Sequence, residues 1–373
     1  MLLRIAGSEK HYEWGSRSLI PDYFSLPEPI TPLAEIWFGT HNAGPATLTD
    51  GSYLSATISR ELGFLAKFLS AAKPLSIQVH PTTKQAEEGF ARENELGMEP
   101  NNPLRNYRDS SAKPELLVAL TPFEALCGFR PLEETAEIFN ELGTVKPIFL
   151  RQAESLAAGD LASVFTDLLS QRALAESFLS DFNNFQPVSN STLKALELAR
   201  YLLSFYPGDS GALVALMLNH LRLEPFEAIF LPAGNLHCYL SGLGVEVMKA
   251  SDNVIRGGLT SKHIDVTELS KVVSFTPLAN PTVRPIKLAE GLIEYQIPEQ
   301  SFRVYKADLD GSRILADLDL LGEAIALGIS GEVAISTSSE EREVLRQSEA
   351  VYLSGSKKFS LAGSGTIILV LGL

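Results

Sequence analysis

Two patterns of apolar and polar residues alternate along the chain. Residues 1 to about 130 are punctuated by Gly and Pro and contain short alternating runs, among them ATISREL, PLSIQVHP and KPELLVALTPFEALCGF. Alternation with a period of two is typical of strands that are buried on one face. This first region is therefore predicted to be mostly β.

The pattern changes between about 132 and 223, where Ala, Leu, Glu and Phe recur at helical spacing. The apolar positions on these stripes include Leu193, Leu196, Leu203, Leu213, Leu216, Met217 and Leu221. Ser189 precedes one stripe and the Pro207-Gly208 pair follows it, as expected where a helix begins and ends. The spacing therefore predicts a helical block.

The β pattern returns after residue 224 and continues, from about 284, to the apolar strand TIILVLGL at the C-terminus. Because one helical block interrupts a β region, we interpret the helices as an insertion and expect an antiparallel sandwich or barrel. The predicted units are residues 1–130 with 224–283, the inserted helical domain 131–223, and a C-terminal β domain 284–373.

Length and composition favour a globular protein of two or three units. The chain has 373 residues, 45% hydrophobic and 20% charged, with no apolar run of the 18 or so residues that a membrane helix needs. Its net charge of −14 repels nucleic acid and anionic membranes. With only two Cys and no apolar leader at the start, a cytoplasmic protein is expected.

Three elements carry residues that suit a metal site. In PLSIQVHP, Gln78 and His80 share the polar face of a strand, although such a face is also compatible with simple solvation. Glu115 is a lone carboxylate at the start of an apolar strand, and a buried carboxylate needs a partner. His237 follows a Pro-Ala-Gly turn, but is also compatible with a satisfied interior histidine.

If these side chains converge, they offer two imidazoles, one carboxylate and one amide oxygen. Such a mixed set suits Zn²⁺, with Mn²⁺, Co²⁺ or Fe²⁺ as alternatives, and leaves a position open for water or substrate. Only the Gln-x-His pair is local in sequence, and a chain with six His offers chance combinations.

An unusually ionic segment follows His237. It contains Glu246, Lys249, Asp252, Arg256 and Lys262. Such a run is most simply a solvated face. Gly257 and Gly258, however, let the backbone approach a ligand closely, so that the neighbouring Arg and Lys can grip a phosphate.

Other residues are predicted to be structural. Cys127 and Cys238 lie among apolar neighbours and are expected to behave as small hydrophobes, while Trp14 and Trp37 are expected to be packing anchors. The remaining histidines, on a helical stripe, in loops or behind the site, receive no ligand assignment; they are His11, His41, His220 and His263.

Taken together, PLSIQVHP, AKPELLVAL, the approach to His237 and ASDNVIRGGLT closely resemble the type I mannose-6-phosphate isomerases, or phosphomannose isomerases. AEIWFGTHNAGPA and TKQAEEGF also look like that family, so the resemblance spans most of residues 10–275. It implies a cupin fold with jelly-roll barrels, an inserted helical domain and one zinc ion per chain. The implied ligands are Gln78, His80, Glu115 and His237.

The resemblance also implies roles for residues outside the ligand set. Arg256 is the implied catalytic cation, and Lys113, Glu246 and Asp252 match active-site positions. Ser76 and Lys262 match positions associated with the substrate phosphate. The implied protein is a cytoplasmic monomer that interconverts mannose 6-phosphate and fructose 6-phosphate through a cis-enediol, with no nucleic-acid or membrane partner.

The sequence departs from the family pattern in two places. Ala112 stands where many members have His before Lys-Pro-Glu, and AEIWFGTHN replaces a more usual His-Pro after the Gly. The general base therefore stays open between Lys113, the carboxylates and a metal-bound water.

Two alternatives belong to other functional classes. A non-catalytic sugar-binding cupin is favoured by Ala112. A cupin Fe²⁺ oxygenase is favoured by two His and one Glu, but Gln78 and the cationic pair count against it.

Overall fold

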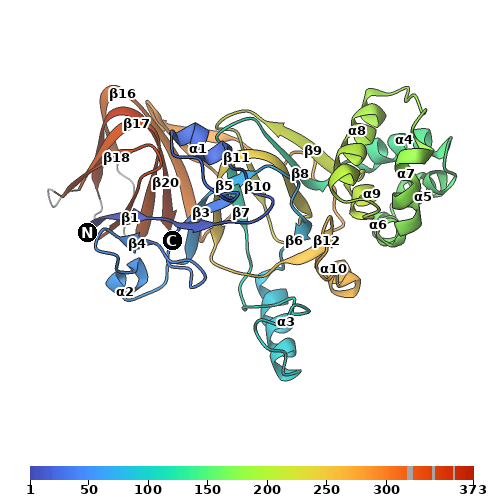
Figure 1. Cartoon of the computed structure of the whole chain (residues 1–373), viewed down its shortest axis with the longest axis horizontal. Helices are drawn as coiled ribbons and strands as arrows, with labels where there is room; N and C mark the ends of the chain where they lie inside the picture. The colour runs from blue at the N-terminus through green and yellow to red at the C-terminus, as the bar shows by residue number, and fades with distance from the viewer. Residues whose placement is uncertain (317–321, 338–340, 356–357) are drawn as a thin grey trace.

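The computed structural model describes residues 1–316, 322–337, 341–355 and 358–373. Two antiparallel sheet systems lie side by side, and a helical domain lies at one end of the molecule (Figure 1). The prediction of a mainly β protein with inserted helices is confirmed. Among the described residues, no helix is long and apolar enough to cross a membrane.

The first sheet system is organised around the long strand β11, His237–Lys249. Its other strands in the described chain are β2 Ser8–Lys10, β3 Glu35–Phe38, β5 Phe64–Ala71, β6 Ile77–Val79, β7 Glu115–Ala119, β8 Phe123–Phe129, β9 Leu218–Leu223, β10 Ala228–Leu231, β12 Ile255–Gly258 and β13 Thr282–Val283.

The two halves of β11 pair with different strands. The first half pairs with β6 and β8, and the second, from Gly242 onward, pairs with β5 and β7. Gly242 has φ of 124°, and a Cβ there would lie 2.6 Å from the ring of Phe123. Only Gly fits this bend, which lets one strand connect two layers of the barrel.

The second sheet system is formed mainly by C-terminal strands. In the described chain they are β14 Pro285–Ala289, β15 Leu292–Tyr295, β16 Phe302–Ala316, β17 Glu323–Thr337, β18 Arg342–Arg346, β19 Ala350–Ser354 and β20 Phe359–Gly372. Two N-terminal strands, β1 Leu2–Ala6 and β4 Thr47–Leu48, complete this sheet, because β1 pairs with both β19 and β4. The division of the chain into three domains therefore stays a prediction.

The helical block begins as expected. Its described helices are α4 Leu132–Gly143, α5 Ile148–Ala157, α6 Leu161–Ser170, α7 Arg172–Asp181, α8 Asn190–Phe205 and α9 Gly211–Ala215. The Ser189 side chain caps α8 by accepting a hydrogen bond from the Thr192 N–H, and α8 ends before Pro207.

The prediction that this block stays helical to residue 223 was wrong at its end, since residues 218–223 form β9. Backbone pairing of β9 with β8 satisfies its donors and acceptors. His220 therefore lies on a strand and not on a helical stripe; its Nε2 is 3.1 Å from the Glu124 carboxylate.

The described chain has four further helices: α1 Leu19–Phe24, α2 Leu54–Ile58, α3 Thr83–Glu95 and α10 Val266–Val272. The expectation of a strand in ATISREL was wrong, because its first residues lie in α2. The first region was also expected to be mostly β, yet it contains α3, which begins with reciprocal hydrogen bonds between Thr82 and Gln85.

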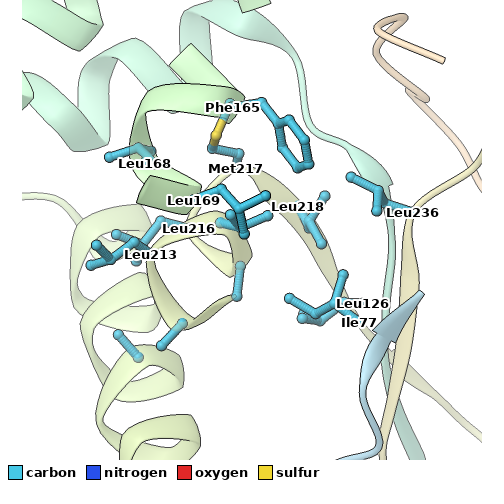
Figure 2. Packing of buried hydrophobic residues seen from close by; sticks show 14 of the residues in the cluster. Ile77, Leu126, Phe165, Leu168, Leu169, Leu213, Leu216, Met217, Leu218 and Leu236 are labelled. Carbon is cyan, nitrogen blue, oxygen red and sulfur yellow. The ribbon is translucent and has the colours of Figure 1, made fainter. Parts of the chain in front are cut away.

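The helical domain and the first sheet system share one hydrophobic core. Figure 2 shows Leu213, Leu216 and Met217, from α9 and the residues after it, in one hydrophobic cluster with side chains of the sheet layer. Ile77, Leu126 and Leu236 lie on the sheet side of this core and are almost fully buried. This packing fixes α9 and the residues after it relative to β6.

Candidate metal and substrate site

Three of the predicted metal ligands lie together inside the first sheet system. β6 and β11 pair with Gln78 opposite His237, and β7 pairs with β11, so the strands bring His80, Glu115 and His237 together. One ligand atom from each of these three side chains lies within 4.8 Å of the other two. His80 Nε2 is 3.3 Å from Glu115 Oε1, and His237 Nε2 is 3.4 Å from Glu115 Oε2.

The hydrogen bonds of the two histidines orient their rings toward this centre. Nδ1 of His80 is 2.7 Å from the Asn253 carbonyl, and Nδ1 of His237 is 2.9 Å from the Asn235 carbonyl. A carbonyl only accepts, so each Nδ1 carries the hydrogen and each Nε2 presents a lone pair. Burial, helped by the Lys113 charge, lowers the pKa of His80 to about 4, so its imidazole is neutral at pH 7.

This cluster fits a metal ion. The Nε2 atoms of both histidines and Oε2 of Glu115 are buried without a hydrogen-bond partner in the described chain. Buried polar atoms left in this state are costly. Two lone pairs and a carboxylate facing one another are the donors that a cation such as zinc takes.

A cavity of about 490 Å³ opens beside the cluster and contains several predicted substrate residues. Its lining comprises Glu13, Trp14, Lys73, Leu75, Ser76, Gln78, Phe205, Tyr206, Arg256, Leu259, Thr260, Ser261 and Lys262. Gln78 lines this cavity and lies opposite His237 and Arg256 on the paired strands. The cluster of three facing ligand atoms does not include it, so its role as a fourth ligand stays a prediction. Phe205 and Tyr206 are the contribution of the helical domain, which forms one wall.

Cations without an ion pair lie in this cavity or near it. In the described chain, the side chains of Arg256, Lys262 and Arg108 have no ion pair. Burial lowers the pKa of Lys262, and the charges of Arg256 and Arg108 lower it further. Unpaired cations in a chain of net charge −14 mark an anion site. The sequence analysis missed Arg108, and its place five residues before Lys113 was the available signal.

Lys113 and Glu115 form a buried ion pair behind the cavity. Lys113 Nζ is 2.7 Å from Glu115 Oε1. Burial by itself would raise the pKa of Glu115, but Lys113 and the neighbouring histidines hold it well below its usual range. The carboxylate is therefore ionised and ready to bind a cation.

Glu246 belongs to a second buried charge network. Lys67 Nζ lies 2.7 Å from the Glu246 carboxylate and 3.4 Å from that of Glu35. Burial and the charge of Glu115 raise the pKa of Glu246, although Lys67 opposes this shift. The sequence analysis missed Lys67, yet a single lysine in the apolar run FLAKFLSA was a signal that a buried partner exists.

Asp252 lies at the exposed edge of the site. Its carboxylate is 3.4 Å from His41 Nε2, and this hydrogen bond lowers the pKa of Asp252. Asp252, Lys113 and Glu246 do not line the cavity described above, so their catalytic roles remain predictions.

The predictions for Cys and Trp differ in outcome. Cys127 and Cys238 are fully buried, and burial raises the pKa of the Cys127 thiol to about 12, as expected of small hydrophobes. Trp37 is buried, but Trp14, expected to be a packing anchor, also lines the cavity.

Comparison with known proteins agrees with this geometry. The family model for the type I phosphomannose isomerase catalytic domain matches residues 2–132. The mannose-6-phosphate isomerase of Salmonella typhimurium is 33% identical over 391 residues, with 97% of each chain covered. This chain belongs to the mannose-6-phosphate isomerase family. The human family member is 31% identical over 94% of this chain and 93% of its own.

Solved structures extend the similarity to the whole fold. A mannose 6-phosphate isomerase bound with zinc and yttrium superposes with a TM-score of 0.90 at 31% identity, covering 100% of this chain and 99% of the other. A zinc-bound holo form of a mannose 6-phosphate isomerase also gives a TM-score of 0.90. The predicted cupin fold and family are therefore confirmed, including the regions where the motifs were weakest.

Proposed function

We propose that this protein is a zinc-dependent isomerase that interconverts mannose 6-phosphate and fructose 6-phosphate through a cis-enediol. The observation that carries the proposal is the buried cluster of His80, Glu115 and His237, whose unpartnered atoms lie beside a cavity with unpaired cations. Membership of the isomerase family favours turnover over the two alternatives, a non-catalytic sugar-binding cupin and an Fe²⁺ oxygenase.

One zinc ion per chain would be held by His80, Glu115 and His237, with Gln78 as the fourth ligand from the cavity side. When bound, the ion supplies Lewis-acid stabilisation of the negative charge that develops on the sugar oxygens. Lys113 keeps the Glu115 carboxylate ionised for this purpose.

The cavity has room for one sugar phosphate, since ligand sites of about 300–1,000 Å³ are usual for small molecules. Lys262 and the Ser76 hydroxyl hold the phosphate, and Arg108 adds positive charge nearby. Arg256 sits opposite Gln78 on paired strands, nearer the reacting carbons, where a fixed cation stabilises the enediolate.

The proton moves between C2 and C1 of the open-chain sugar. Lys113, Glu246 and Asp252 are the candidate bases. Asp252 is ionised at neutral pH because its pKa is lowered, whereas burial raises the pKa of Glu246 toward the range of a general base. Ala112 supplies no imidazole, so the base stays open between these three groups and a metal-bound water.

The test is to incubate zinc-loaded protein with mannose 6-phosphate and follow both sugars by NMR. We expect conversion to fructose 6-phosphate, no conversion after metal removal, and poor conversion of mannose without its phosphate. Binding without conversion would favour a sugar-binding cupin, and oxygen consumption by iron-loaded protein would favour an oxygenase.

We also propose that the protein works as a cytoplasmic monomer with no nucleic-acid or membrane partner. Light scattering should then give the mass of one chain, 40.5 kDa. A mass of twice this value would contradict the monomer.

A further inference from the structure

Two segments far apart in sequence, residues 108–111 and 251–253, are joined by side-chain hydrogen bonds beside the metal cluster. Asn253 is fully buried at their centre. Its Oδ1 accepts hydrogen bonds from the backbone N–H groups of Arg108, at 2.7 Å, and Asp109, at 3.2 Å. Its Nδ2 donates to the carbonyls of Asp109, at 2.8 Å, and Ser111, at 2.9 Å. One amide therefore satisfies four backbone groups of the opposite segment.

The Asp109 side chain, in the first segment, bonds in turn to residues of the second segment. Its carboxylate accepts from the Ser251 hydroxyl at 2.9 Å and from the Asp252 N–H at 2.8 Å. We call the side chains of Asp109, Ser251 and Asn253 the clasp. Because each segment satisfies polar groups of the other, most of them part-buried, loss of one clasp residue leaves several of them without partners.

The clasp connects directly to a metal ligand. The backbone carbonyl of Asn253 accepts the hydrogen of His80 Nδ1 at 2.7 Å, and this bond aims His80 Nε2 at Glu115. The Asn253 side chain fixes the position of that carbonyl. His237, in contrast, is oriented by the Asn235 carbonyl, which lies outside the clasp.

The segment 108–111, which the clasp joins to residues 251–253, is also connected to the site. Arg108 begins this segment and adds its charge to those of Arg256 and Lys262. Lys113 and Glu115 follow it in sequence and form the buried ion pair. A shift of residues 108–111 would therefore move the carboxylate ligand together with Arg108 and Lys113.

We propose that Asn253 is a positioning residue for the metal site: its side chain holds the two segments together, so that His80 and Glu115 face one another before an ion binds. The inference rests on the proposed zinc site but not on the isomerase reaction. Groups that orient a metal-binding histidine typically contribute 10–100-fold to metal affinity.

The test compares Asn253→Ala with Asn219→Ala. Asn219 makes the same kind of contact outside the clasp and away from His80, since its amide donates to the carbonyls of Cys127, Gly128, Phe129 and Leu278. Zinc affinity is measured by competition with a chromophoric chelator, with no sugar present. We expect about a 10–100-fold loss for Asn253→Ala and none for Asn219→Ala, although both variants lower the melting temperature.

Hydrogen exchange supplies a readout on the metal-free protein. The amides of Arg108 and Asp109 bond to Asn253 Oδ1, so they should exchange faster in Asn253→Ala and at the wild-type rate in Asn219→Ala. If Asn253→Ala does not fold, Asn253→Asp replaces it. That variant keeps the acceptors but loses both donors, and the same loss of zinc affinity is expected.

Wild-type zinc affinity in the Asn253 variants, or an equal loss in Asn219→Ala, would overturn the inference. So would a wild-type protein that binds no zinc, which would also remove the proposed site. A protein with Asn253-dependent zinc binding but no isomerase activity would leave the inference standing and contradict the proposed function.

Discussion

The two sheet systems share an antiparallel architecture but bury different kinds of side chain. The system around β11 encloses ionisable groups that are at most 5% exposed; they are Lys67, His80, Glu115, His237 and Glu246. In residues 284–373, Thr337 is the one buried polar residue among the side chains that the structure describes. There the core is filled by residues such as Val333, Ile335 and Leu361.

This difference between the two cores indicates which buried residues serve stability and which serve the site. Buried charges cost free energy unless they are paired, and apolar residues of similar volume often serve stability equally well. The C-terminal sheet shows that this chain can fill a sheet core without charge. The pairs Lys113–Glu115 and Lys67–Glu246 therefore offset the cost of burying charge in the system that contains the cluster of His80, Glu115 and His237.

The largest expected effect follows from removing a ligand in the charged core. His237→Ala should abolish stoichiometric zinc binding and lower kcat/KM at least about 1,000-fold, because several kcal/mol of electrostatic stabilisation are lost. Ile335→Val, in the apolar C-terminal core, is the control and should keep full activity. Metal analysis and circular dichroism check both variants; full metal occupancy in His237→Ala would refute the ligand assignment.

The cavity cations should separate binding from catalysis. Arg256→Ala should lower kcat about 100–1,000-fold, because the charge that it meets develops during enolisation. Lys262→Ala should mainly raise KM, since a lysine that holds the phosphate, as proposed for Lys262, binds ground and transition states alike. Steady-state kinetics measure both. An Arg256→Ala variant with raised KM and normal kcat would make Arg256 a phosphate ligand instead.

Lys67→Met tests the cost of the buried charges directly. Removing this cation leaves Glu35 and Glu246 without their partner and should lower the free energy of unfolding by about 3–5 kcal/mol. Adding Glu246→Gln to Lys67→Met should recover part of the lost free energy of unfolding but should not recover activity. Ile335→Val, the control in the other core, should cost about 1 kcal/mol. Urea denaturation measures the free energy of unfolding of each variant. Equal losses in Lys67→Met and Ile335→Val would contradict the difference between the two cores.

The charged core should also make stability depend on pH. Burial lowers the pKa of His80 to about 4 in the folded, metal-free protein, against about 6.5 for an ordinary histidine. Between these values the unfolded chain binds more protons, so the free energy of unfolding falls as pH falls, by about 3 kcal/mol in total.

His80→Gln should remove the contribution of His80 to the pH dependence of the free energy of unfolding. Urea denaturation of the metal-free protein at pH 7 and at pH 4.5 measures this dependence. The C-terminal sheet contributes no histidine to this slope, since the sequence has no His beyond His263. An unchanged slope in the variant would show that other groups cause the pH dependence.

Local patterns were sufficient to predict much of the fold and of the metal cluster. The alternation around Gln78 and His80 and the Ser189 cap are encoded within a few residues. Leu218, Leu221 and Leu223 are compatible with helical and strand spacing alike, so β9 was decided by its pairing with β8. The capping pair Thr82 and Gln85 was present in the sequence, and α3 could have been predicted from it.

Features that depend on distant contacts could not be predicted from a single sequence. Nothing near Leu2–Ala6 indicates that this strand joins the C-terminal sheet. Lys67 is conspicuous in an apolar strand, but its partner Glu246 lies 179 positions away. The contact of Arg108 with Asn253 likewise spans 145 positions, and such contacts become visible only after folding.

The central claim is that the charged cluster of the first sheet is the metal centre of a mannose 6-phosphate isomerase. Its most direct test is to titrate zinc into metal-free protein and measure the conversion of mannose 6-phosphate at each step. We predict that activity rises in proportion to added zinc and stops rising at one ion per chain. Activity that is independent of zinc, or absent at full occupancy, would contradict the account.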